Sequence, residues 1–128
     1  LALTSNEGAF DFQTQNIDGK ELYKVVIETS KSWKNSKNLM YVVGATKEEY
    51  FTEIRKLIPD SFLLVPGVGA QGGSLKEVCN YGMNQNVGLL INSSRGIIYA
   101  SNGVDYAEKA RVEALKMQVE MSEILKNL

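Results

Sequence analysis

The chain has 128 residues, with 14 Lys and Arg against 15 Asp and Glu, and this net charge of −1 argues against general binding to nucleic acid or an anionic membrane. Its 44% hydrophobic and 23% charged residues are typical of a soluble globular domain, and no apolar run approaches the ~20 residues that span a bilayer. With no histidine and one cysteine, the sequence excludes Ser-His-Asp and Cys-His nucleophiles and zinc sites built from those residues.

The first quarter of the chain predicts a strand end, a loop and a helix. Residues 1–4 are apolar and read as the end of a strand without a partner, so we expect the chain to be a piece of a longer protein; a processed or trimmed N-terminus is the alternative. A loop follows at 5–8, and Asp18-Gly19 forms a turn or cap. Apolar side chains at approximately helical spacing predict a helix over 21–33, with its apolar positions at Leu22, Val25, Val26 and Trp33.

The second unit begins with the apolar run 39–43, which predicts a buried strand closed by Gly44-Ala45-Thr46. Thr46 is a candidate N-cap, with Glu49 three residues later as its capping-box partner. The helix extends to residue 58, and Pro59-Asp60 stops it. Its inner face is predicted to carry Tyr50, Ile54, Leu57 and Ile58.

The third unit has a strand at 62–65, ended by Pro66, and a glycine-rich loop over 67–73. Ser74 then caps a short helix that runs to Tyr81. Cys79 lies within this helix and is predicted to be a small buried hydrophobe. A single cysteine also fits a reducing compartment, and we expect a cytoplasmic protein.

The fourth unit has a strand at 87–91, a loop at 92–95 and a long helix from the cap Asp105 to Leu125. The apolar stripe of this helix is rich in alanine and stands alone, which favours packing on a sheet over a coiled coil. Its positions are Ala107, Ala110, Ala114, Met117, Met121 and Ile124.

The pattern therefore repeats strand, loop and helix four times, at 32 residues a unit, the usual size of a βα repeat. Apolar runs without alternation predict strands buried on both faces, hence a parallel sheet. Two architectures of the α/β class fit. One is a small doubly wound sheet, and the other is half of a TIM (β/α)8 barrel, which would expose two unpaired edges and need its missing half.

The loops after the strands are the candidate functional segments in both architectures. Four glycines within 67–73 let the backbone approach a ligand closely, and their N–H groups can hold a phosphate; a plain flexible loop is the alternative. Arg95 directly follows a strand, beside Ser93 and Ser94. Its guanidinium could bind a phosphate with two hydrogen bonds or pair with a carboxylate at a barrel mouth. Arg55 and Arg111 lie among charges on helices and are expected to be solvated.

The first loop offers Ser5 and Asn6, either as ligand contacts or as turn and cap residues. Gln71 is the only long polar side chain of the glycine-rich loop, and its amide could bridge two ligand groups.

Taken in order, these loops resemble orotidine 5'-phosphate decarboxylase, and the longer bacterial subgroup most closely. The motifs are Thr4-Ser5-Asn6, Val42-Val43-Gly44-Ala45-Thr46, Pro66-Gly67-Val68-Gly69-Ala70-Gln71-Gly72-Gly73 and Asn92-Ser93-Ser94-Arg95-Gly96-Ile97-Ile98. The resemblance covers essentially the whole chain. It implies a TIM barrel of which this chain, 1–128, holds strands five to eight within a single domain.

The resemblance also implies an activity: decarboxylation of orotidine 5'-monophosphate (OMP) to uridine 5'-monophosphate (UMP), in de novo pyrimidine biosynthesis, without metal or organic cofactor. Gln71 and Arg95 would grip the 5'-phosphate, together with backbone N–H groups around Gly72, Gly73, Ser94 and Arg95. Ser5 would contact the pyrimidine, with Gln71 near it, and the glycine-rich loop would close over the substrate. The complete enzyme would be a homodimer.

The Asp-x-Lys-x-x-Asp motif and further Lys with which the family acts on the carboxylate and the carbanion are absent from this sequence, and Glu7 stands where the family often has proline. No catalytic residue is therefore assigned here, and the chain alone is expected to be inactive. Two other functions remain open: a non-catalytic domain that binds a phosphate ligand, and a half-barrel that pairs with itself.

Overall fold

The computed structural model describes residues 1–46, 48–69 and 72–127, which form two compact units, Leu1–Asn92 and Ser93–Leu128. The first unit is built on a parallel sheet in the order β3 (Tyr41–Val42), β4 (Leu63–Pro66) and β5 (Leu89–Asn92). A parallel bridge between Leu3 and Val43 adds the first segment beside β3. The strands thus lie in sequence order, without the reversal of a doubly wound sheet, and this order favours a barrel.

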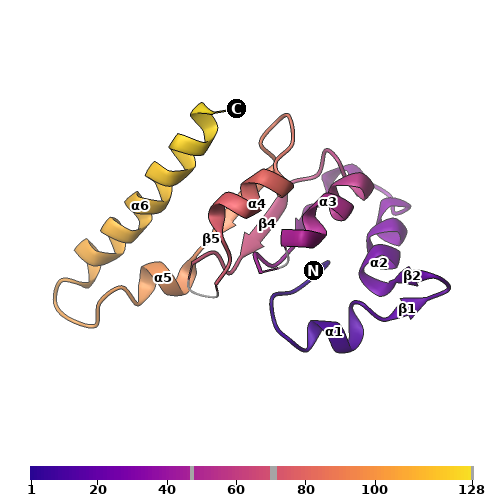
Figure 1. The fold of residues 1–128 in the computed structure, drawn as a ribbon, viewed down its shortest axis with the longest axis horizontal. Coiled ribbons are helices and arrows are strands. Elements are labelled where there is room, and N and C mark those ends of the chain that lie inside the picture. Colours follow the sequence, from indigo (N-terminus) through magenta and orange to yellow (C-terminus); the bar gives the residue numbers. More distant parts are fainter. Residues whose placement is uncertain (47, 70–71, 128) are drawn as a thin grey trace. The chain divides into compact units, whose positions relative to one another are not determined.

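Three helices connect and cover these strands: α2 (Leu22–Lys31), α3 (Glu48–Leu57) and α4 (Leu75–Gly82). In Figure 1 they lie along the sheet, with α3 in contact with both α2 and α4. The predicted cap of α4 is confirmed, because Ser74 Oγ accepts a hydrogen bond of 3.2 Å from the Glu77 backbone N–H. The βα order predicted from the sequence is therefore present in this unit.

One face of the sheet is buried beneath the helices. Leu63 and Leu89 are in register on neighbouring strands and share a face, and a Cβ added at Gly82 of α4 would lie 3.2 Å from Leu89 Cδ2. Along β4, Leu63 is fully buried whereas Leu64 is only partly so, and Leu90 of β5 is 44% exposed. Within Leu1–Asn92, α2, α3 and α4 therefore bury one face of the sheet, and the predicted burial of the strands on both faces is not seen in this unit.

A short helix and a hairpin occupy residues 9–21, where only the turn Asp18-Gly19 and the helix start at Glu21 are predicted. They are the helix α1 (Ala9–Phe12) and a hairpin of β1 (Asn16–Ile17) and β2 (Lys20–Glu21). Asp18 and Gly19 form the hairpin turn with φ of 50° and 85°, so the predicted turn is confirmed. Two consecutive left-handed residues are the geometry that joins strands in a tight hairpin.

The buried face of α2 differs from the predicted one. Tyr23, Ile27 and Ser30 are buried, and their spacing of four and three places them on one side of the helix. Val26 is 42% exposed, and Trp33 is 58% exposed because the helix ends at Lys31, before it. A short 3-10 turn (η1, Ser36–Asn38) then leads to β3.

Helix α3 begins at Glu48 and ends before Pro59, as predicted. Phe51, which is not among the predicted inner-face residues, is fully buried, as is Ile54, whereas Tyr50 is only partly buried. Thr46 Oγ1 donates a hydrogen bond of 3.3 Å to the Ser5 carbonyl. Residue 47 lies outside the described part, so a capping box between Thr46 and Glu49 stays a prediction.

Strand β5 starts two residues later than predicted, because Val87 lies in a turn. Its φ is +66°, and it exchanges backbone hydrogen bonds with Asn84. A β-branched residue rarely adopts this left-handed conformation, so apolar character alone misplaced the strand boundary. Gly88, with φ also +66°, follows it into the strand.

The second unit contains α5 (Ser94–Ile98) and α6 (Tyr106–Lys126), which contact each other. Asp105 precedes α6 as predicted, yet its side chain accepts from Ser101 Oγ at 2.6 Å rather than capping the helix. No described residue of α6 is buried, so packing of its alanine-rich stripe on a sheet stays a prediction. Within the described residues, no helix is both long and apolar enough to span a membrane.

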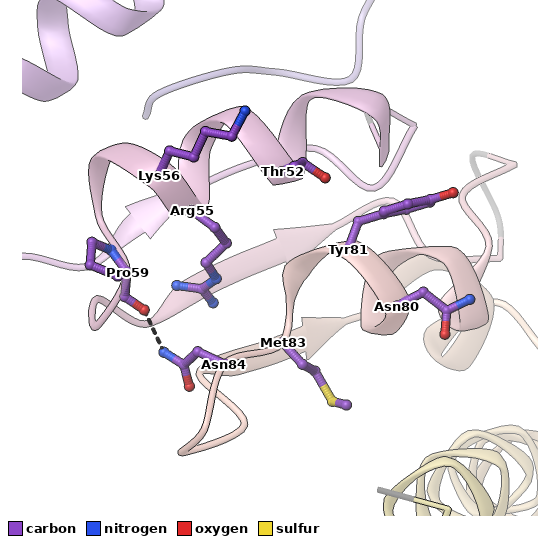
Figure 2. Close-up of a pocket in the computed structure, with 8 residues that line it drawn as sticks. All are labelled: Thr52, Arg55, Lys56, Pro59, Asn80, Tyr81, Met83 and Asn84. Atoms are coloured by element: carbon purple, nitrogen blue, oxygen red, sulfur yellow. Dashed lines mark hydrogen bonds between the residues drawn. The ribbon is translucent and has the colours of Figure 1, made fainter.

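Arg55 of α3 is a structural residue, which corrects the expectation that it is solvated. Its guanidinium is half-buried and donates to three distant carbonyls: Gly82 at 2.5 Å, Ser61 at 2.6 Å and Gly88 at 2.9 Å. Figure 2 shows the side chain reaching from α3 toward the segment after α4. Burial lowers the pKa of Arg55, while Asp60 raises it. Arg55 thus joins the ends of α3 and α4 to the starts of β4 and β5.

We expect Arg55→Ala to lower the free energy of unfolding by about 2 kcal/mol, because several carbonyls lose a charged donor at once. The free energy of unfolding of Arg55→Lys should lie between those of the unsubstituted protein and Arg55→Ala, since an ammonium cannot reproduce the planar guanidinium fork. Urea denaturation measures both, with Arg111→Ala on the exposed face of α6 as the control. Equal midpoints for Arg55→Ala and Arg111→Ala would contradict a joining role.

Candidate functional site

The carboxyl ends of the strands come together through backbone hydrogen bonds. The Gly44 N–H donates to the Leu3 carbonyl, and the Ala45 N–H donates to the Pro66 carbonyl, both at 2.8 Å. These two bonds connect the segment after β3 to the ends of both neighbouring segments. The first three predicted loops therefore start at one edge of one sheet, where parallel α/β proteins bind their ligands.

Ser5 lies in a bend at this edge and packs tightly against Gly44. A Cβ added at Gly44 would lie 2.6 Å from the Ser5 backbone N and would overlap Ser5 Oγ. Ser5 is partly exposed, and its neighbour Asn6 is exposed. The predicted loop position of both residues is confirmed, and the edge leaves Ser5 within reach of a ligand.

The described residues of the glycine-rich loop, 67–69 and 72–73, bond to one another beside Ala45. The Gly72 N–H donates to the Gly69 carbonyl at 2.8 Å, and the Gly73 N–H donates to the Gly67 carbonyl at 3.3 Å. A Cβ at Gly73 would lie 3.1 Å from Ala45 C, so this glycine allows the loop to pass close to the segment after β3. The structure thus brings Gly73 to the same edge as Ser5.

Two predicted site residues differ from expectation in their surroundings. Ser94 and Arg95 were predicted in a loop, but they are the first residues of α5, in the second unit. The predicted strand, 87–91, ends one residue too early, because Asn92 still belongs to β5. Helix α5 then starts two residues later, at Ser94. Both side chains are exposed. Gln71, predicted to bind phosphate and pyrimidine, lies outside the described residues, as does Ala70.

A separate groove of about 470 Å³ lies between α3 and α4, and Figure 2 shows its lining. Pro59 and Asn84 follow the two helices, so the groove lies on the side where the next strands begin. Asn84 Nδ2 donates to the Pro59 carbonyl across it at 2.8 Å. No predicted site residue lines this groove, and its charged Arg55 is already bonded to backbone carbonyls.

The described residues with shifted pKa values lie on α2 and α3. Burial raises the pKa of Tyr23, and the Glu21 carboxylate raises it further. The buried Tyr23 hydroxyl has no hydrogen bond of ordinary geometry, and the ring stacks edge-on against Tyr50. A hydrogen bond from Lys56 lowers the pKa of Glu53. None of these groups is a predicted site residue.

The cysteine and the acidic residues indicate no further chemistry at this edge. Cys79 is buried within α4, as predicted for a small hydrophobe. Across the described ranges, no three Cys, Asp or Glu side chains are grouped so that they could hold a metal ion. Ser5, Gly44 and the glycine-rich loop therefore remain the candidate ligand-binding elements of the first unit.

The sequence is similar over nearly its whole length to orotidine 5'-phosphate decarboxylases. It is 76% identical to that of Flavobacterium johnsoniae over 125 residues, which are 98% of this chain and 46% of the relative. It is 54% identical to that of Phocaeicola vulgatus over 126 residues, again 98% of this chain and 46% of the relative. The chain thus spans about half the length of the curated relatives it matches. No family model matches it.

Solved structures agree with the sequence comparison. The orotidine 5'-monophosphate decarboxylase of Leishmania donovani matches with a TM-score of 0.71 and 31% identity, over 92% of this chain and 45% of that one. The UMP synthase of the same organism matches with a TM-score of 0.74 and 34% identity, over 91% of this chain and 26% of that one. The resemblance predicted from the loop motifs is confirmed, and the neighbours are TIM barrels, as predicted for the fold.

Proposed function

We propose that this chain is the C-terminal half of an orotidine 5'-phosphate decarboxylase, and that residues 1–128 form half of a single TIM-barrel domain. The complete enzyme would convert OMP to UMP. The observation that carries the proposal is the 76% identity over 98% of the chain, which includes the loops at the sheet edge. The sequence order of the parallel strands supports it, because a barrel is wound without reversal.

In this proposal the chain binds the two ends of the nucleotide. Arg95 and Gln71 hold the 5'-phosphate, since a guanidinium fork and an amide can donate several hydrogen bonds to phosphate oxygens. Ser5 hydrogen-bonds the pyrimidine from the sheet edge. Backbone N–H groups around Ser94 and in the glycine-rich loop complete the phosphate site.

The glycine-rich loop must change its hydrogen bonds to take this part. The N–H groups of Gly72 and Gly73 donate to carbonyls within the loop, so binding a phosphate through them exchanges neutral acceptors for a charged one. We propose that this exchange accompanies closure over the substrate. Phosphate binding then contributes to orienting the reacting end of the nucleotide, although the phosphate itself does not react.

Catalysis proper would come from the N-terminal half. The sequence contains no Asp-x-Lys-x-x-Asp segment, which in the family destabilises the carboxylate and protonates the carbanion. No cofactor is proposed. The same resemblance supports a homodimer in the cytoplasm, and sedimentation of the complete enzyme together with cell fractionation would test both.

A chimera tests the proposal directly. This chain replaces the matching C-terminal part of the Flavobacterium johnsoniae relative, so that the relative supplies the N-terminal half. We expect the chimera to convert OMP to UMP, and the 128-residue chain alone to convert none. Absorbance of the pyrimidine ring follows the reaction. A folded chimera that neither binds UMP nor turns over OMP would overturn the proposal, and turnover by the chain alone would overturn its division of roles.

A further inference from the structure

Gln13 and Thr4 form a two-bond clamp immediately before Ser5. The Thr4 backbone N–H donates to Gln13 Oε1 at 2.8 Å, and Gln13 Nε2 donates to Thr4 Oγ1 at 2.8 Å. Both polar ends of the amide are thereby used, and both bonds are partly buried. The Thr4 hydroxyl in turn donates to Asn6 Oδ1 at 2.6 Å. The residues on both sides of Ser5 are thus joined by a hydrogen bond.

Gln13 is itself fixed to the body of the unit. Its backbone N–H donates to the Ala9 carbonyl at 2.7 Å, and its carbonyl accepts from the Tyr23 N–H at 2.9 Å. Tyr23 is a fully buried core residue of α2. The clamp therefore connects Thr4 to the buried start of α2 rather than to a free loop.

Ser5 is held from two other directions as well. Its carbonyl accepts from Thr46 Oγ1 at 3.3 Å, and its side chain packs on the bare Cα of Gly44. These contacts restrict Ser5 from the side of β3. The clamp acts on the residue before Ser5. Among the described residues, Gln13 is the side chain that hydrogen-bonds to the Thr4 backbone N–H.

We infer that Gln13 is a positioning residue, which sets Ser5 for contact with the pyrimidine by fixing the backbone of Thr4. This inference rests on the proposed function, because it assumes that Ser5 meets the ring. Its physical basis is that a hydrogen-bonding group misplaced by about 1 Å loses much of its effect on a bound ligand. Gln13 touches no substrate in this scheme and acts only through Thr4 and Ser5.

The test separates the pyrimidine from the phosphate. Binding of UMP and of ribose 5-phosphate, which carries the phosphate but no ring, is measured by calorimetry on the chimera. We expect Gln13→Ala to weaken UMP binding about tenfold and to leave ribose 5-phosphate binding within about twofold, since only the ring contact depends on Ser5. Loss of kcat/KM for OMP should accompany the weaker binding of UMP.

Two further variants control this result. Gln15→Ala removes the same amide two residues later, where it is exposed and bonds only weakly, at 3.4 Å, to the Phe10 carbonyl; it should bind both ligands normally. Gln13→Glu keeps an acceptor for the Thr4 N–H and should recover part of the UMP affinity. If Gln13→Ala fails to fold, Gln13→Glu carries the same comparison with a smaller expected loss.

Each outcome decides the inference. If Gln13 variants weaken UMP and ribose 5-phosphate equally, Gln13 supports the fold without setting Ser5, and the inference is overturned. Unchanged UMP binding overturns it as well. An unsubstituted chimera that binds no UMP overturns the proposed function and this inference together, whereas a chimera that binds UMP leaves the proposed function standing whatever Gln13 does.

Discussion

In the complete enzyme, Arg95→Ala should lower kcat/KM for OMP by about 100-fold, the largest loss expected for any single side chain of this half. A bidentate hydrogen bond between a guanidinium and a phosphate is about twice as strong as a neutral one, and its loss removes roughly 2–3 kcal/mol of binding. Arg95 is the arginine available for this task, because Arg55 is bonded to carbonyls and Arg111 lies on α6.

The substrate itself provides the control for Arg95. Orotidine, which lacks the phosphate, should react equally slowly with the unsubstituted enzyme and with Arg95→Ala. The two enzymes should therefore differ in kcat/KM only for the phosphorylated substrate. Arg95→Lys should recover part of the loss, since an ammonium keeps the charge without the fork. Arg111→Ala should match the unsubstituted enzyme. A change of less than twofold for Arg95→Ala would remove Arg95 from the phosphate site.

Gly44→Ala is expected to lower kcat/KM by a comparable factor, because it disturbs Ser5, which is proposed to contact the pyrimidine end of the nucleotide. The added Cβ would lie 2.6 Å from the Ser5 backbone N and 2.9 Å from Ser5 Cα, and backbone atoms cannot swing aside as a side chain can. The segment that carries Ser5 must therefore move. Overpacking of this kind costs about 1–3 kcal/mol, and displacement of a ligand-binding group by 1 Å can lower activity about 100-fold.

Steady-state kinetics and thermal unfolding of the chimera together measure the effect of Gly44→Ala. Gly8→Ala is the matched control, because a Cβ there would meet only side-chain ends, Asn6 Nδ2 at 3.3 Å and Asp11 Oδ2 at 3.7 Å, and the φ of Gly8 is −61°. We expect Gly8→Ala to keep full activity. If Gly44→Ala retained normal kcat/KM, close packing of Gly44 on Ser5 would have no bearing on the site.

The local sequence determined the order of elements and the positions of the loops. Ser74 was identified as the cap of α4, Pro59 as the residue that ends α3, and Asp18-Gly19 as a turn, because each depends on the chemistry of a few consecutive residues. The loop motifs also sufficed for the resemblance, since they are short and contiguous. For the same reason the sequence placed Ser5 in a loop after a strand without any knowledge of its neighbours.

Only the tertiary structure decided which residues support those loops. Gln13 is nine residues from Thr4, and Arg55 is 33 residues from Gly88, so no local pattern links either pair. Arg55 looked like a solvated residue because its neighbours on α3 are charged, yet its guanidinium satisfies backbone carbonyls at the ends of other elements. The chemical type of a residue is known from the sequence, whereas its hydrogen-bond partner depends on how distant backbone segments are brought together in the fold.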